Sequence, residues 1–322
     1  MTERADELGV LTSTRRVVDR ARLVAIDGEA VERVAEALAA AAAPPVAWDL
    51  EHHFVDGTAR TAQYVLVLDA LNFSFWGQPR WQVEHRGEWV NGYWALALSL
   101  KRAVEAGVPI LDARYLAEIS SGDLGGILDG RGVVPLLDER AANLREVGRT
   151  LLARYDGQFV EMVAAAGSAV ALVRLLVRDL PSFDDEAVYE GERVLFYKRA
   201  QICAADLAGS FGGESWGRFR DLDALTAFAD YKVPQVLRRL GILRYAPDLA
   251  APIDRLELIP PGSPPEVEIR AATIWGVEYL RQALALRGQP RTASQVDYLL
   301  WELGQTPSAD DRPYHRTRTI YY

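Results

Sequence analysis

The chain has 322 residues, of which 49% are hydrophobic, 25% charged and 9% aromatic, a composition typical of a globular protein with a buried core. Its 36 lysine and arginine residues stand against 45 aspartate and glutamate residues, so the net charge is −9 and a broad cationic face for a nucleic-acid duplex is not expected. The one cysteine, Cys203, excludes an internal disulfide and indicates a reducing, cytoplasmic compartment.

The first 22 residues are rich in charge, and no apolar run here or later reaches the roughly 20 residues that a membrane span needs. We therefore expect neither a signal peptide nor contact with a membrane. Leucine, valine and alanine recur at helical spacing in most segments, for example in 31–38 and 144–152. An alanine-rich helix is expected to end within Ala39–Ala43, because Pro44-Pro45 follows. The sequence thus predicts a mainly α fold.

The main exception is the segment 81–90, in which two short alternating runs flank Arg86-Gly87. This pattern predicts a β-hairpin, and one small hairpin or sheet is the most strand structure that we expect. Glycines at 122, 125, 126, 130 and 132 predict a loop-rich middle without the spacing of a phosphate-binding loop. No polar stretch is long enough to mark a domain boundary, so we expect residues 1–322 to form a single domain.

Two helices with identifiable start signals are expected near the end of the chain. Ser263-Pro264-Pro265-Glu266 predicts a capping box and a helix that runs to about Leu286. Thr292 or Ser294 is the expected cap of the next helix, which ends at Gly304. The buried stripe of this second helix is predicted to be Val296, Leu299, Leu300 and Leu303.

The sequence has too few histidines, at unsuitable spacings, for a metal site. The four histidines stand at 52, 53, 85 and 315, where no pair has the i, i+4 spacing of a helical zinc site and no cysteine accompanies them. We therefore expect no metal and no cofactor.

Aromatic residues, carboxylates and amides crowd together in five segments, namely 69–76, 196–201, 228–235, 294–302 and 311–322. For one segment alone, core packing and helix capping would account for the pattern. Together the segments favour a site for a planar, guanine-like heterocycle, because a ring can stack on an aromatic wall while a carboxylate accepts N–H bonds from its edge. The same segments carry cations for a single phosphate, namely Lys198, Arg199, Lys232, Arg316 and Arg318.

The strings NFSFW, FYKRAQI, FADYKVPQ, SQVDYLLWE and YHRTRTIYY closely resemble the signature segments of the queuosine salvage protein family, and the similarity extends from about Leu11 to Tyr322. The resemblance implies a helical fold similar to the helix-hairpin-helix DNA glycosylases. It also implies an N-glycosidase (a hydrolase of an N-glycosyl bond) that releases queuine, a 7-deazaguanine, from queuosine 5′-monophosphate for salvage into tRNA. The chain departs from the DNA-repair enzymes because Tyr231–Gln235 stands where their L-P-G-V-G hairpin would be.

Site roles follow from the same resemblance. Asp297 matches the catalytic carboxylate, as nucleophile or as stabiliser of an oxocarbenium-like transition state. Phe228 and Asp230, followed by Tyr231, match the base-binding residues. Further substrate contacts are expected from His53, Trp301, Glu302, Lys198, Arg316 and Arg318. The substrate is a small molecule, with no duplex nucleic acid as partner, and we expect a monomer.

Alternatives to these roles remain open. Asp297 could simply stabilise the first turn of its helix, a position that would also keep it deprotonated. Asp230 could cap a helix or pair with Lys232, and the tail arginines could pair with Asp310 or Asp311. As a whole, the chain could be a nonenzymatic nucleic-acid-binding module on a helix-hairpin-helix scaffold, or a nucleotide-binding scaffold without turnover.

Overall fold

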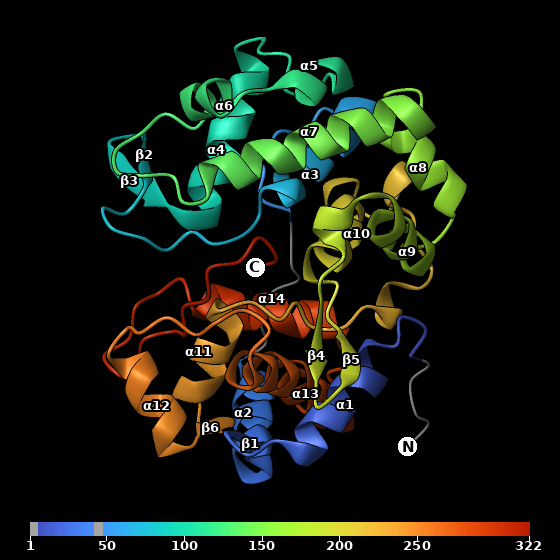
Figure 1. Ribbon diagram of the computed structural model, residues 1–322. Coiled ribbons are helices and arrows are strands. Elements are labelled where there is room, and N and C mark those ends of the chain that lie inside the picture. The colour runs from blue at the N-terminus through green and yellow to red at the C-terminus, as the bar shows by residue number, and fades with distance from the viewer. Residues whose placement is uncertain (1–5, 42–47) are drawn as a thin grey trace. The chain divides into compact units, whose positions relative to one another are not determined.

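The computed structural model describes residues 6–41 and 48–322, which fall into two compact units. The first unit contains residues 6–41, Asp185–Gln201 and Asp221–Arg318, and the second contains residues 48–184, Ile202–Arg220 and Thr319–Tyr322. Within the described residues, helices dominate and strands form only short antiparallel pairs (Figure 1). The mainly α prediction is therefore confirmed. The single domain and the helix-hairpin-helix likeness stay predictions, and the expected stop at Pro44-Pro45 lies outside the described residues.

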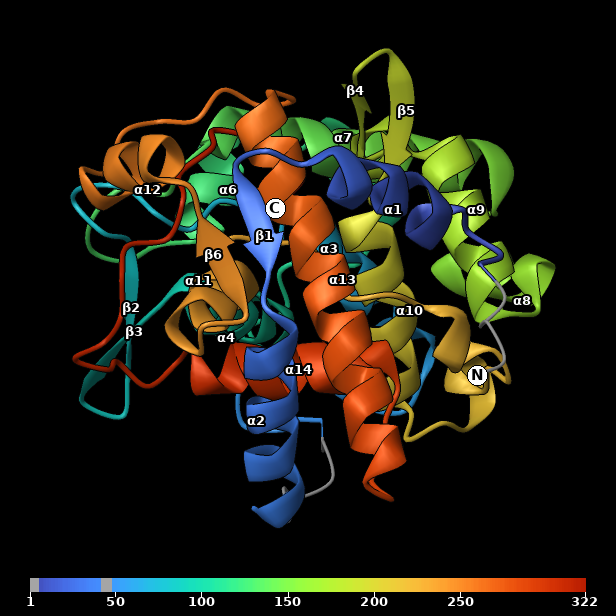
Figure 2. The same ribbon diagram turned by 90° about the horizontal axis from the view of Figure 1, so that it is seen from below.

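Helix α13 (Pro264–Leu286) forms the centre of the first unit, and most of its side chains are buried. Figure 2 shows it between α1 (Val10–Arg20) and α2 (Gly28–Ala40), both of which contact it. The other helices of this unit are α11 (Lys232–Arg239), α12 (Pro247–Asp254), α14 (Ala293–Leu303) and the start of α10 (Lys198–Ser210). Because α11 and α14 also pack on α13, the helix that follows Asp230 and the helix that carries Asp297 share one core.

Three two-stranded sheets occur among the described residues, where at most one was expected. The predicted hairpin is confirmed as β2 (Gln82–His85) and β3 (Glu88–Asn91), joined at Arg86 and Gly87, which both have positive φ. The other pairs are β4 (Glu186–Tyr189) with β5 (Glu192–Leu195), and β1 (Val24–Ile26) with β6 (Leu243–Tyr245). The last pair joins three-residue strands that are distant in sequence, so no local pattern marked it.

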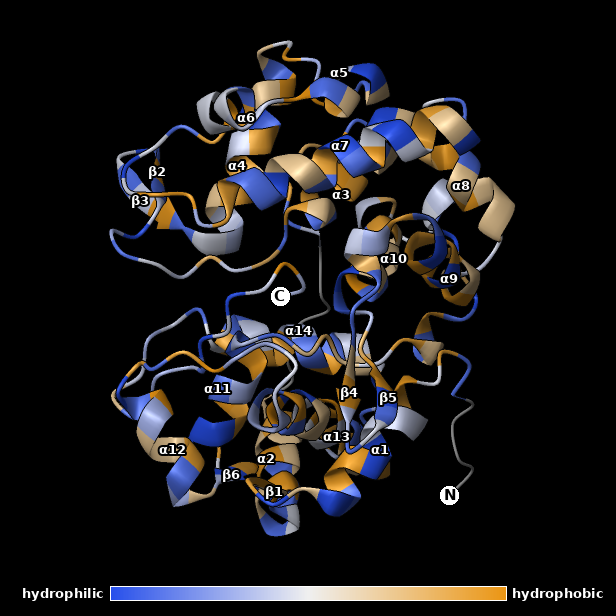
Figure 3. Ribbon diagram, viewed as in Figure 1, coloured by the Kyte–Doolittle hydropathy of each residue, from blue (hydrophilic) through white to orange (hydrophobic). Residues whose placement is uncertain are grey.

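The second unit packs its helices around α3 (Ala59–Ala70), which is buried from Thr61 onward, and α7 (Leu137–Arg154). Hydrophilic and hydrophobic residues alternate along α7 in Figure 3, as expected for a helix with one face in the core. The other elements here are α4 (Gly92–Glu105), α5 (Ala113–Glu118), α6 (Ser121–Ile127), α8 (Phe159–Ala166), α9 (Ala169–Asp179), the rest of α10, and the 3-10 helices η1 (Pro181–Phe183) and η2 (Ser215–Gly217).

A close approach between α5 and α7 occurs at Gly148. A Cβ atom on Gly148 would lie 2.3 Å from the backbone nitrogen of Ala117 and 2.5 Å from the carbonyl oxygen of Ala113. These distances are far below van der Waals contact, so α5 can lie against α7 only because residue 148 has no side chain.

The helix boundaries confirm some start signals and contradict others. Thr292 caps α14 and forms a capping box with Gln295, as one of the two expected caps. At α13, however, the Ser263 hydroxyl donates to the carbonyl of Pro260 and makes no cap bond, so the predicted capping box is wrong. Glu266 instead accepts the N–H of Gly262.

Two further expectations are wrong. Gly122, Gly125 and Gly126 lie inside α6 rather than in a loop, because Ser120 and Asp123 form a capping box that starts this helix. Leu303 is 40% exposed and does not belong to the buried stripe of α14. Among the described residues, no helix has the length and apolar character needed to cross a membrane.

Candidate active site

The segment 225–231 of the first unit runs between the 3-10 helix η3 (Leu222–Ala224) and α11, and side chains from α10 and α14 bind its backbone. The N–H of Phe228 donates to Oδ1 of Asp297 on α14 at 2.9 Å. The N–H of Thr226 donates to Oε1 of Gln201 on α10 at 2.8 Å, and Nε2 of Gln201 donates to the Thr226 hydroxyl at 3.0 Å. The segment that carries the expected base-binding residues is thus fixed to two helices.

Asp297 is 5% exposed and is the fifth residue of α14, so it lies beyond the first turn in which it was expected. Burial raises its pKa well above the usual value, and the negative charge of Asp230 raises it further. The Phe228 N–H and the charge of Lys198 lower the pKa, but burial outweighs them. The expectation that the helix terminus keeps Asp297 deprotonated is therefore wrong, because desolvation of the carboxylate is the larger effect.

Asp230 is half-buried and lies two residues before the first residue of helix α11. Its Oδ1 accepts the N–H groups of Lys232 at 2.9 Å and Val233 at 2.8 Å, so the helix-capping alternative is realised. The ammonium group of Lys232 donates to Oε1 of Gln235 at 3.2 Å. Burial raises the pKa of Asp230, while the nearby positive charge of Lys198 lowers it. Capping occupies one carboxylate oxygen, so it leaves room for a ligand at the other.

Lys198 is the first residue of α10 and is 5% exposed. Its positive charge lowers the pKa of both Asp230 and Asp297. Phe228, 9% exposed, supplies an aromatic ring in the same segment. We refer to Lys198, Phe228, Asp230 and Asp297 as the acid–lysine cluster. The sequence predicted all four, and the structure brings them together in one unit.

The tail residues of the first unit differ in their surroundings. His315 is buried, and burial together with the charge of Arg270 lowers its pKa to about 3, so its imidazole is neutral at physiological pH. Arg316 is half-buried, with its guanidinium carbon 5.9 Å from the centre of the Tyr314 ring, whereas Arg318 is exposed. Arg316 is therefore the more firmly placed of the two arginines.

Tyr231 and Trp301, two aromatic residues expected at the site, each lie against a neighbouring tyrosine ring. The ring of Tyr231 lies 4.9 Å from that of Tyr314, and the ring of Trp301 lies 6.0 Å from that of Tyr298. Trp301 is half-buried and Glu302 is exposed. Their helix, α14, also carries Asp297.

His53 belongs to the second unit, where both of its ring nitrogens are hydrogen-bonded. Nδ1 lies 2.7 Å from the carbonyl oxygen of Asp49 and must donate to it, so Nε2 accepts from the Tyr93 hydroxyl at 2.8 Å. Burial lowers the pKa of His53 to about 4. A hydrogen bond from His53 to a ligand would thus require Tyr93 to move away.

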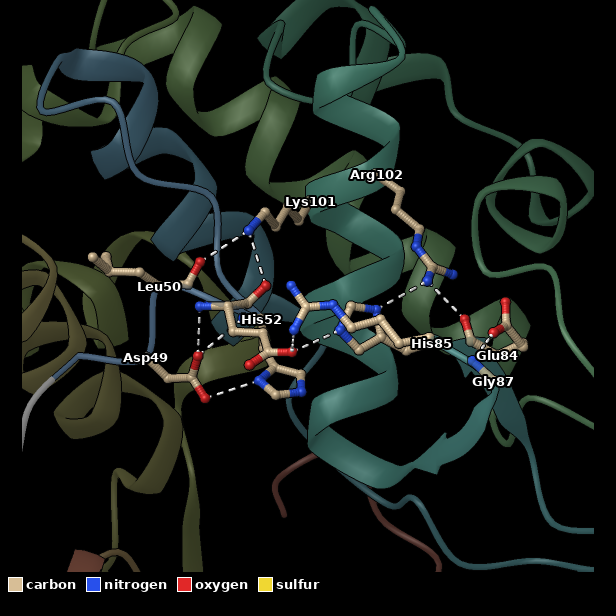
Figure 4. A network of polar contacts seen from close by, with 10 residues as sticks. Asp49, Leu50, His52, Glu84, His85, Gly87, Lys101 and Arg102 are labelled. Atoms are coloured by element: carbon tan, nitrogen blue, oxygen red, sulfur yellow. Dashed lines mark hydrogen bonds and ion pairs between the residues drawn. The ribbon is translucent and has the colours of Figure 1, made fainter.

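The polar network in Figure 4 anchors the segment that carries His53. Lys101 on α4 donates to the carbonyl oxygens of Leu50 and Glu51, each at 2.9 Å. The carboxylate of Asp49 lies 2.8 Å from Nδ1 of His52. These contacts tie residues 49–53 to helix α4, which explains the fixed orientation of the neighbouring His53.

Two rival chemistries find little support in the described part of the chain. Gly213–Gly217 has the G-x-S-x-G spacing of serine hydrolases, but it lies at η2 after a helix, whereas a nucleophile elbow needs a strand before it. No group of three or more histidine, cysteine, aspartate or glutamate residues with metal-binding geometry occurs among the described residues.

Sequence reasoning missed the residues that support the acid–lysine cluster. Gln201 stood inside a quoted motif but was given no role. Arg270 on α13 forms an ion pair with Asp185. An arginine in the apolar segment 264–286, with Glu266 four positions before it, was a signal that the sequence offered for Arg270. Asp185 had no such signal, because its partner is 85 positions away.

The fold and the cluster together define a class of protein. It is mainly helical, and one unit gathers two carboxylates, a buried lysine and an aromatic ring, groups that suit a small planar ligand with an anionic substituent. A family model described as "Queuosine salvage protein" matches residues 52–322. The chain belongs to this family.

Several curated proteins share this similarity over most of their length, and each carries the name queuosine 5′-phosphate N-glycosylase/hydrolase. The protein from Sphaerobacter thermophilus is 59% identical over 323 residues, covering 100% of both chains. The protein from Mus musculus is 38% identical over 332 residues, covering 96% of this chain and 97% of its own. That from Schizosaccharomyces pombe is 35% identical over 289 residues, covering 81% and 83%.

Proposed function

We propose that this chain hydrolyses the N-glycosidic bond of queuosine 5′-monophosphate and releases queuine for salvage into tRNA. The relatives named queuosine 5′-phosphate N-glycosylase/hydrolase are similar to this chain over nearly its whole length. The observation in the structure that carries the proposal is the acid–lysine cluster, in which the charge of one buried lysine acts on two carboxylates.

Asp297 is the proposed catalytic carboxylate. Cleavage passes through an oxocarbenium-like ribose, and an anion beside the anomeric carbon stabilises charge that develops only as the bond breaks. Burial raises the pKa of Asp297, and Asp297 acts as an anion or as a nucleophile in its ionised form. The Phe228 N–H and Lys198 favour the ionised form. Water supplies the hydroxyl group to ribose 5-phosphate.

The base is proposed to stack on Phe228 while the free oxygen of Asp230 accepts N–H bonds from its guanine-like edge. A 7-deazaguanine has carbon in place of N7, so protonation of N7 is not available and the proton must reach N9. His53, Tyr231, Trp301 and Glu302 are proposed as further contacts to the substrate, and Lys198, Arg316 and Arg318 as candidates for the phosphate. We propose that the chain acts as a monomer in the cytoplasm without a nucleic-acid partner.

The test is to incubate the pure protein with queuosine 5′-monophosphate and to detect queuine and ribose 5-phosphate by mass spectrometry. Release of both products with multiple turnovers supports the proposal. Saturable binding without release would instead identify a nucleotide-binding scaffold. A gel shift of duplex DNA or tRNA with a steep salt dependence and no base release would identify a nucleic-acid-binding module.

A further inference from the structure

A buried ion pair joins Arg270 of α13 to Asp185, the residue that precedes strand β4. The two terminal nitrogens of Arg270 donate to the two carboxylate oxygens of Asp185 at 2.8 and 2.6 Å. Arg270 is 2% exposed and Asp185 is 1% exposed. Glu266 approaches Arg270 at 3.5 Å, so the site holds one cation and two carboxylates.

Further hydrogen bonds of this pair go to the backbone of two of the three segments that carry the acid–lysine cluster. Nε of Arg270 donates to the carbonyl oxygen of Ala229 at 3.1 Å, and Ala229 stands between Phe228 and Asp230. Oδ2 of Asp185 accepts the N–H of Lys198 at 3.2 Å. One ion pair therefore connects the backbone on both sides of the cluster.

The turn before Lys198 is held in the same way. The backbone carbonyl of Asp185 accepts the N–H groups of Phe196 and Tyr197, both at 3.0 Å. Tyr197 has a φ of 51°, a left-handed conformation that a tyrosine adopts only when its surroundings impose it. The guanidinium carbon of Arg270 lies 3.9 Å from the centre of the Phe196 ring. The backbone conformation of the turn that leads into Lys198 thus depends on Asp185 and Arg270.

We infer that Arg270 and Asp185 are positioning residues for the proposed reaction, which set Lys198 and the Phe228–Asp230 segment at the spacing that catalysis needs. A buried ion pair contributes little to stability compared with well-packed apolar side chains, so stability alone does not explain it. Apolar side chains in place of Arg270 and Asp185 could not make the hydrogen bonds to Ala229 and Lys198. The inference rests on the proposed N-glycosidase activity.

The first test compares Arg270→Lys with the control Arg281→Lys. Arg281 lies on the same helix and makes a similar two-bond contact to the buried Glu278, at 2.9 and 2.6 Å, but these bonds stay within α13. Lysine keeps the charge in both variants and cannot reproduce the planar fork. At saturating queuosine 5′-monophosphate, we expect kcat to fall about 10²-fold in Arg270→Lys and to stay within about twofold of the wild type in the control. Equal kcat values in the two variants would overturn the inference.

A second variant separates positioning from stability. In Arg270→Met combined with Asp185→Leu and Glu266→Gln, no unpaired charge of this site is buried, so the melting temperature is expected to recover relative to Arg270→Met alone. The kcat is expected to stay low, because Lys198 and Ala229 still lack their partners. Recovery of kcat together with the melting temperature would show that the pair is only structural.

The wild-type protein in the same assay keeps this inference distinct from the proposed function. If the wild type releases no queuine, the proposed function fails. The pair is then tested by calorimetric titration with queuine, for which Arg270→Lys is expected to bind at least tenfold more weakly than Arg281→Lys. Equal affinities of the two variants for queuine would by themselves refute a positioning role.

Discussion

Replacement of Asp297 by asparagine tests the proposed chemistry with the least disturbance of the structure. An asparagine Oδ1 can still accept the N–H of Phe228, which now donates to Asp297 at 2.9 Å, so the segment 225–231 should keep its place. The substitution removes only the negative charge. Loss of one preorganised electrostatic group lowers turnover by about 10²- to 10³-fold, and we expect kcat to fall by this amount.

The same substitution should make the folded protein more stable near neutral pH, although it lowers kcat. Burial raises the pKa of Asp297 above its value in the unfolded chain, so the folded state holds the proton more tightly. Above the unfolded pKa of about 3.9, the wild type therefore loses about 1.4 kcal/mol of stability for each pH unit until the folded pKa is passed. Asparagine has no proton to lose. The variant should be more stable than the wild type near pH 7, and this difference should vanish near pH 4.

Two measurements check these expectations. Steady-state release of queuine gives kcat, and urea unfolding at pH 4.5 and pH 7.5 gives the difference in stability between variant and wild type at each pH. Asp297→Ala serves as the control, because it removes both the charge and the acceptor for Phe228. Near-normal turnover of Asp297→Asn would remove Asp297 from the mechanism. A stability difference that does not change with pH would refute the account of its raised pKa.

Three further predictions concern ligand binding and pH. Asp230→Ala should weaken queuine binding by about 1–3 kcal/mol in calorimetry, since a charged acceptor is lost; unchanged affinity would leave Asp230 as a helix cap alone. If the half-buried Arg316 receives the phosphate, Arg316→Ala should lower kcat/KM much more for the nucleotide than for the nucleoside, whereas Arg318→Ala, at an exposed position, should affect both little. Equal losses on both substrates would exclude this role. Because the folded pKa of His53 is lowered to about 4, its neutral form stabilises the fold above the unfolded pKa of about 6.5, and this stability should be lost as pH falls toward 4. Acid unfolding of His53→Gln should show a smaller loss over that range, and an unchanged curve would contradict the prediction.

Local signals accounted for much of the fold. Helical periodicity and the Thr292–Gln295 capping box placed α14, and alternation around Arg86-Gly87 placed the hairpin. The errors arose where distant or competing contacts decide the outcome. The Ser263 hydroxyl donates to Pro260 in preference to capping, and β1 finds its partner in a strand more than 200 residues away.

The site was predicted to a similar degree. Motifs identified the members of the acid–lysine cluster, because residue type carries the chemistry. The raised pKa of Asp297 could not be predicted from its helical position, because it comes from burial and from the charge of Asp230. The role of Asp185 was equally hidden, because its contact with Arg270 forms only when residues 85 positions apart meet.

The close contact at Gly148 has a consequence for engineering a more heat-resistant variant. Glycine in a helix costs up to about 1 kcal/mol relative to alanine, so helical glycines are the usual first targets for stabilisation. At Gly148 the added methyl group would meet backbone atoms of α5 at 2.3 Å and force the two helices apart. A Cβ atom on Gly276 in α13 would have side-chain atoms as its nearest neighbours, those of Ile242 and Leu237 at 3.4 Å and that of Leu243 at 3.7 Å. Alanine at 276 is thus the useful substitution, while the same change at 148 would separate α5 from α7.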